Sequence, residues 1–142
     1  MTSGLAIVVS PAMAGYGPDI PGPHRNRPHE TTPGARIINV SSGAGSLTLH
    51  CDPAFPFRPG FSPLYHASKT ALNAMTLAMA IELEPCGVRV SAVSPGHTKT
   101  HLNNYSGGDP VEEGAREAVR MALMEGGPTG TFTHATLGTL PW

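Results

Sequence analysis

The sequence carries little charge and no long apolar run. Only 13% of its 142 residues are Asp, Glu, Lys or Arg, and the formal net charge is −1. A charge this small argues against nucleic acid or an anionic membrane as the main partner. No apolar segment approaches the roughly 20 residues that a membrane-spanning helix needs. We therefore expect no nucleic-acid partner and no membrane partner.

Cysteines are also few, and the first residues lack basic side chains. Cys51 and Cys86 form no spaced framework, which favours free thiols in a cytosolic protein. The start of the chain has a short apolar run followed by small residues, as a signal peptide does. No Lys or Arg precedes Arg25, however, and a signal peptide needs a basic n-region. We predict a cytoplasmic location, with secretion as the less favoured alternative.

Proline and glycine, by contrast, are abundant and unevenly placed, with 15 and 17 residues respectively. Proline fixes φ and removes a backbone donor, while glycine adds backbone entropy. We therefore predict that residues 1–34 form an irregular arm, mobile between Pro11 and Pro33, and that a single domain covers residues 35–142. A second proline-rich stretch, residues 47–64, is predicted to be a long loop such as a lid.

The domain reads as strand, helix, strand. Ala35–Val40 is a short β-branched run, residues Tyr65–Leu83 are rich in helix formers, and Val88–Gly96 is a second apolar run. Such a βαβ unit makes its two strands parallel. The sequence therefore predicts an α/β fold, a partial Rossmann-like doubly wound parallel sheet.

Three further expectations concern the helices and the last strand. One stripe of the first helix is expected to face the core, and it consists of Ala71, Leu72, Met75, Met79 and Leu83. A second helix is expected to begin at Asp109 as N-cap, with Pro110 at the first position, and to end near Met124. A last strand is expected near Gly130.

Polar residues follow or flank the predicted strands where ligands bind in open parallel sheets. Ser42 follows the first strand, and Tyr65 and Lys69 stand one helical turn apart. A phenol with a pKa of about 10 releases its proton poorly at neutral pH, and a neighbouring ammonium lowers that pKa. Tyr65 is thus a candidate general acid and base.

Plainer interpretations of the same residues stay open. Tyr65 and Lys69 are also compatible with a surface pair whose polar ends reach water. Ser42 is compatible with a residue that only ends its strand, and Pro95-Gly96 with an ordinary turn. His97 and His101 have the spacing of two metal ligands on a helix, but no third ligand is evident, so we predict no metal site.

The three motifs in this order resemble the short-chain dehydrogenase/reductase family, carbonyl-reductase-like branch. The motifs are Ser42 after a strand, Tyr65-x-x-x-Lys69, and Pro95-Gly96-x-x-x-Thr100. The resemblance implies an NADP- or NAD-dependent oxidoreductase acting on a small carbonyl or alcohol, with NADP favoured. It implies catalytic roles for Ser42, Tyr65 and Lys69. It also implies that the cofactor is held by Tyr65, Lys69, Pro95, Gly96, His97, Thr98 and Thr100.

The family's front half has no counterpart in the sequence. The glycine-rich turn that approaches the pyrophosphate, the Asn-Asn-Ala-Gly segment and the catalytic Asn are all absent. We therefore expect a chain that lacks the N-terminal βαβ units and binds its cofactor weakly or not at all. The strand Ala35–Val40 is expected to have an unpaired edge, and both faces of the helix Tyr65–Leu83 to lack cover.

Two functions remain open. The first is the oxidoreductase itself. The alternative is a catalytically inactive truncated fragment that self-associates, or pairs with a full-length relative, with the helix Tyr65–Leu83 as the surface for a homo-oligomer. The substrate cannot be predicted, because fold and site do not fix the substrate pocket.

Overall fold

The computed structural model describes residues 6–9 and 34–142, which form a five-stranded sheet in the order β1-β2-β3-β4-β5. The strands are β1 (Ala6–Val9), β2 (Arg36–Val40), β3 (Arg89–Ser94), β4 (Thr131–His134) and β5 (Gly138–Thr139). The first four are parallel, and β5 is antiparallel to β4. The predicted α/β fold, a partial Rossmann-like parallel sheet, is confirmed.

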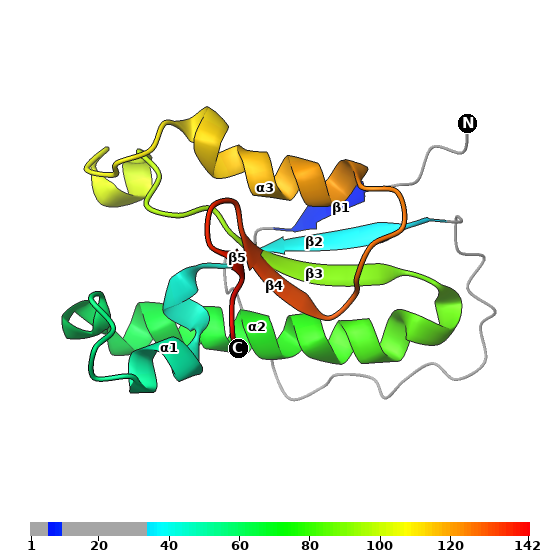
Figure 1. The fold of residues 1–142 in the computed structure, drawn as a ribbon, viewed down its shortest axis with the longest axis horizontal. Coiled ribbons are helices and arrows are strands. Elements are labelled where there is room, and N and C mark those ends of the chain that lie inside the picture. The colour runs from blue at the N-terminus through cyan, green and yellow to red at the C-terminus, as the bar shows by residue number, and fades with distance from the viewer. Residues whose placement is uncertain (1–5, 10–33) are drawn as a thin grey trace.

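Two long helices cover opposite faces of this sheet (Figure 1). They are α2 (Pro63–Leu83) and α3 (Val111–Leu123). Successive side chains of a strand point to opposite faces, so each strand contributes to two cores. On the α3 side, Ile38 and Val93 pack with Met121. On the α2 side, a second cluster contains Ala80, Val88 and Val90.

Strand β3 is the centre of the fold. All of its residues after Arg89 are buried, which confirms the prediction of a strand covered on both faces. It pairs with β2 in parallel, as a βαβ crossover requires, and Ile37 lies opposite Val90. The strand predicted near Gly130 is β4, and its Phe132 is fully buried against Ala92 and Leu140.

The edge of β2 is not unpaired, contrary to expectation. Strand β1 pairs with it in parallel, from Ala6↔Arg36 to Val9↔Asn39. A four-residue apolar run at the start of the chain gave too weak a signal to be separated from the predicted arm. The rest of that arm, including the segment Pro11–Pro33 predicted to be mobile, lies outside the described residues.

The predicted loop over residues 47–64 also contains helical structure. It includes helix α1 (Leu47–Cys51) and a short 3-10 helix, η2 (Arg58–Gly60). Ser46 caps α1, since its Oγ accepts a bond from Leu49 N at 3.2 Å. The prolines that follow the helix suggested a loop, and the serine before it was the missed signal.

The buried stripe of α2 differs from the predicted one. Met75 is 48% exposed and Ala71 is exposed as well. The buried positions are His66, Leu72, Asn73, Thr76 and Ala80. Most of these are polar, and two of them, Asn73 and Thr76, dock α2 on β2 and the turn after it through hydrogen bonds to Ser41 and Asn39.

Smaller differences concern the ends of the helices. Helix α3 has Pro110, not Asp109, at its N-cap, and it ends at Leu123. Helix α2 begins at Pro63, two residues before the predicted start. Within the described residues, no helix combines the length and the apolar character needed to cross a membrane.

We expect Gly45→Ala to destabilise the fold. Gly45 lies in the 3-10 helix η1 (Gly43–Gly45), and an added Cβ would lie 2.8 Å from the carbonyl carbon of Lys69 and 2.8 Å from Asn73 Nδ2. Overpacking of this kind costs about 1–3 kcal/mol. Gly60→Ala is the matched control, because nothing lies within 4 Å of its added Cβ. Urea unfolding of both variants checks this, and an equal midpoint for the two would contradict it.

Candidate functional site

The candidate site lies where β2 and β3 end. Ser41 N donates to Val93 O at 2.8 Å, and Gly43 N donates to Ser94 Oγ at 3.0 Å. These two bonds hold the turn after β2 against the end of β3. The predicted residues that follow the two strands are therefore brought to one edge of the sheet, where parallel α/β folds bind ligands.

Ser42 has a structural role that leaves its proton free for another. It is the N-cap of η1, and its Oγ accepts a bond from Ala44 N at 3.2 Å. A hydroxyl has one donor and two acceptor positions, so accepting this bond does not use the O–H. The half-buried Ser42 both ends the strand and retains a donor for an oxygen in the site.

Tyr65 and Lys69 lie on the same face of α2, as their spacing predicts. Lys69 Nζ is 5.9 Å from the centre of the Tyr65 ring. The same ammonium donates to the backbone oxygen of Val40 at 3.2 Å, which ties it to the end of β2. Burial lowers the pKa of Lys69, because desolvation disfavours its charged form. Tyr65 is 39% exposed, so its ring can be reached from outside.

The first turn of α2 is held by a histidine. Ser62 is the N-cap, Pro63 is the first helical residue, and Ser62 N donates to His66 Nδ1 at 3.0 Å. The His66 ring packs against Phe61 at 4.3 Å and His50 at 4.8 Å between ring centroids. This aromatic cluster from the α1 region fixes the turn that presents Tyr65.

The Pro-Gly loop after β3 is tightly shaped. Gly96 has φ +79, a conformation that favours glycine, and an added Cβ would lie 3.1 Å from His134 Nε2. Pro95 O accepts a bond from Thr98 Oγ1 at 3.1 Å. His97 is exposed, and its backbone oxygen accepts from Gly108 N at 2.8 Å.

The end of this loop is capped from within. Thr100 is the N-cap of a 3-10 helix, η4 (His101–Asn103), and shares a capping box with Asn103. The hydroxyls of Thr98 and Thr100 thus shape the loop itself. Across the described part of the chain, no group of three or more His, Cys, Asp or Glu side chains is arranged to hold a metal ion.

Sequence reasoning missed two polar residues of α2 that bind the strand bearing the site. Ser41 Oγ donates to Asn73 Oδ1 at 2.6 Å, and Asn39 Nδ2 donates to Thr76 Oγ1 at 2.9 Å. All four side chains are buried. The available signal was the position of Asn73 and Thr76, four and seven residues after Lys69 and so on the same helical face.

The chain matches a known protein family over more than half of its length. A sequence profile described as short chain dehydrogenase matches residues 28–110, more than half of the chain. The chain belongs to the short-chain dehydrogenase family. A short-chain dehydrogenase (anuI) of Penicillium roqueforti is 34% identical over 99 residues, covering 68% of this chain and 39% of that protein. Human dehydrogenase/reductase SDR family member 4 is 41% identical over 84 residues, covering 58% and 30%.

Solved structures of short-chain dehydrogenases share the fold. The carbonyl reductase Sniffer of D. melanogaster superposes with a TM-score of 0.61 at 27% identity, covering 76% of this chain and 41% of that one. An NADPH-bound carbonyl reductase from chicken fatty liver gives 0.63 at 25% identity, covering 76% and 43%. The carbonyl-reductase-like resemblance is confirmed. The chain spans less than half the length of each of these relatives.

Proposed function

We propose that this chain carries the catalytic half of an NADP- or NAD-dependent oxidoreductase that interconverts a small carbonyl compound and its alcohol. One observation carries the proposal above the others. The Lys69 ammonium stands beside the Tyr65 ring while it is bonded to Val40 O at the end of β2. Family membership supports an oxidoreductase, and the cytoplasmic location stays a prediction.

The chemistry requires a proton at the right place. A carbonyl that accepts a hydride becomes an alkoxide and must be protonated. A positive charge close to a phenol favours the phenolate and so eases transfer of its proton. Tyr65 would give this proton in reduction and take it back in oxidation, while Ser42 would donate a hydrogen bond to the substrate oxygen.

The residues present fit the nicotinamide end of a dinucleotide. The Lys69 ammonium is a donor suited to ribose hydroxyls, and the loop of Pro95, Gly96, His97, Thr98 and Thr100 ends at the same sheet edge. When bound, the cofactor supplies or accepts the hydride. The NADPH-bound carbonyl reductase from chicken supports a preference for NADP. The described residues contain no glycine-rich turn for the pyrophosphate, so we propose that binding is weak.

Where the chain is active, for example when fused to the missing half of the family fold, we expect Tyr65→Phe to remove turnover without unfolding it. The change deletes one hydroxyl of a partly exposed ring, and losing a positioned acid–base group costs about 10²–10⁴-fold in rate. The assay follows NADPH oxidation with a panel of ketones and aldehydes, together with the melting midpoint. Tyr105→Phe is the control, since Tyr105 is an exposed tyrosine outside α2, in the turn that follows residues 101–103. Near-full activity of Tyr65→Phe would show that the phenol is not the proton donor.

Calorimetric titration of the chain with NADPH should give a Kd weaker than micromolar. The reason is that a pyrophosphate is normally held by backbone N–H groups at a helix N-terminus, and the glycine-rich turn that allows this approach is missing. Lys69→Met should weaken the remaining binding further, and NADH titrated in parallel tests the preference for NADP. A micromolar or tighter Kd would contradict this prediction.

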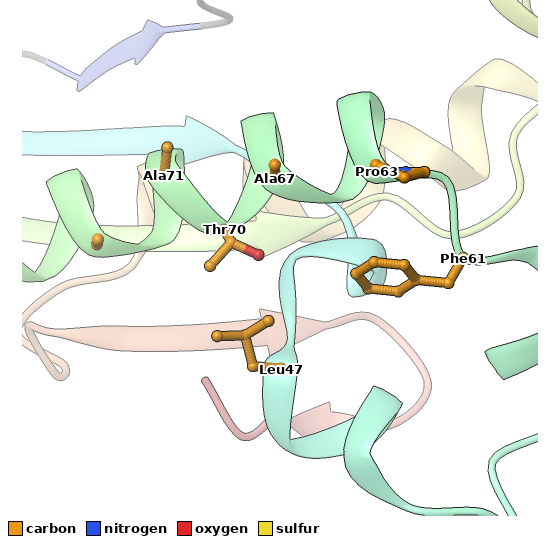
Figure 2. A pocket seen from close by; sticks show the side chains of 7 residues that line it. Leu47, Phe61, Pro63, Ala67, Thr70 and Ala71 are labelled. Atoms are coloured by element: carbon orange, nitrogen blue, oxygen red, sulfur yellow. The ribbon is translucent and has the colours of Figure 1, made fainter.

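A second candidate is a catalytically inactive chain that associates through α2. Its outer surface is unusually apolar for an exposed helix, with Leu64 87%, Ile81 64% and Met75 48% exposed. A groove of about 530 Å³ runs beside it. Figure 2 shows the side chains that line this groove. The residues that line the groove are Leu47, Phe61, Pro63, Ala67, Thr70, Ala71 and Ala74. Exposed apolar patches of this kind favour contact with a second copy or a full-length relative.

If α2 is an association surface, Ala71→Glu should convert the assembled chain to a monomer. The carboxylate would enter the apolar groove and would have to lose its hydration on assembly. Light scattering coupled to size exclusion measures the mass of each species. Leu102→Glu is the control, because Leu102 is also exposed but lies on η4 and does not line the groove. A monomeric parent chain at all concentrations would rule out self-association.

A further inference from the structure

Two contacts from adjacent residues of β2 and its turn reach two successive turns of α2. Val40 O accepts a bond from Lys69 Nζ at 3.2 Å, and Ser41 Oγ donates to Asn73 Oδ1 at 2.6 Å. Ser42, the candidate donor to the substrate oxygen, is the next residue along the chain. On α2, the Ser41–Asn73 bond therefore lies one helical turn after Lys69. In the turn after β2, it lies one residue before Ser42.

Asn73 is placed as a fixed anchor rather than as a surface residue. Its side chain is 3% exposed, and that of Ser41 is 2% exposed. A Cβ added at Gly45 would lie 2.8 Å from Asn73 Nδ2, so the turn after β2 packs closely against this amide. The amide nitrogen has no hydrogen-bond partner within the described part of the chain. A buried polar group with an unmet donor is costly, so stability alone gives a weak reason for an asparagine at this position.

We propose that Asn73 and Ser41 are positioning residues, whose hydrogen bond sets the distance and register between the Tyr65–Lys69 face of α2 and the turn that carries Ser42. Its catalytic meaning rests on the proposed function. Neither residue touches the reacting atoms in this scheme. They act on the site through Lys69, which lies on the same face of α2 as Asn73 and is bonded to Val40 O. They also act through Ser42, which follows Ser41 in the chain.

A buried hydrogen bond fixes the relative position of two elements in a way that apolar packing does not. Packing between apolar side chains tolerates sliding, whereas a hydrogen bond between buried groups restricts distance and angle. A displacement of about 1 Å in a catalytic group can lower turnover by up to 10²-fold. Loss of the Ser41–Asn73 bond should also let water reach Lys69, and rehydration of its ammonium raises the pKa that burial lowers.

The chain contains only two lysines, which makes a direct test possible. In the full 142-residue chain labelled with [ε-¹³C]lysine, Lys69 and Lys99 give two NMR signals whose pH titration reports each pKa. Lys99 is exposed and serves as an internal reference. Tyr65 is a titratable side chain that lies beside Lys69. The titration is therefore repeated in a Tyr65→Phe background, which separates the ionisation of Lys69 from that of Tyr65.

Three single variants and one double variant separate positioning from stability. Ser41→Ala and Asn73→Ala each remove the same bond from opposite sides, and the double variant should add nothing further. Thr76→Val is the matched control, because it removes the Asn39–Thr76 bond of 2.9 Å on the same helix, one turn farther from Lys69. Unfolding midpoints of all variants are measured together with the titrations.

We expect the Lys69 pKa to rise toward the ordinary lysine value of about 10.4 in Ser41→Ala and Asn73→Ala. In Thr76→Val we expect it to be unchanged. Where the parent chain turns over substrate, kcat should fall by about 10- to 100-fold in the first two variants, with little change in KM. If the Lys69 pKa had the same value in Ser41→Ala, Asn73→Ala and Thr76→Val, the proposal would be overturned, whether or not the chain is active. A chain without turnover whose Lys69 titration still shifts would count against activity of this chain by itself and leave the positioning role supported.

Discussion

The docking of α2 on the turn after β2 is the contact on which the site depends. Gly45 allows the two backbones to approach until an added Cβ would lie 2.8 Å from the backbone of Lys69. At that separation Thr70 Oγ1 reaches Gly45 O at 3.1 Å, and Lys69 reaches Val40 O. Because Tyr65 lies one turn before Lys69, the ammonium bonded at the end of β2 also lies 5.9 Å from the centre of the Tyr65 ring.

The parts of this structure that local patterns encode were predictable. The β-branched run Ala35–Val40, the long helix and the run beginning at Val88 form a βαβ unit, and the parallel pairing of β2 and β3 follows from that order. The shared face of Tyr65 and Lys69 follows from their spacing alone. Both predictions rest on a strong period or a chain-order rule, which is why they survive in the folded chain.

The parts that depend on a tertiary neighbour were not predictable. An apolar stripe through Met75 suggested the buried face of α2, but the polar face through Asn73 and Thr76 is the one that binds β2. That choice depends on partners more than 30 residues away in the chain. Strand β1 was missed for the same kind of reason, since its four residues become a strand by pairing with β2. Only the pairing, not the local sequence, separates them from the arm.

The polar character of this docking face fits the proposed acid–base role of the site. An apolar stripe would bury α2 at lower risk, because each buried donor or acceptor has to find a partner. Apolar contact, however, does not fix the register of a helix against a strand to within a fraction of an ångström. Acid–base transfer requires hydrogen-bond distances between the donor and the reacting oxygen. Directional bonds at Ser41 and Val40 would meet that requirement, and they hold a partly desolvated ammonium near the ring of the proposed acid–base residue.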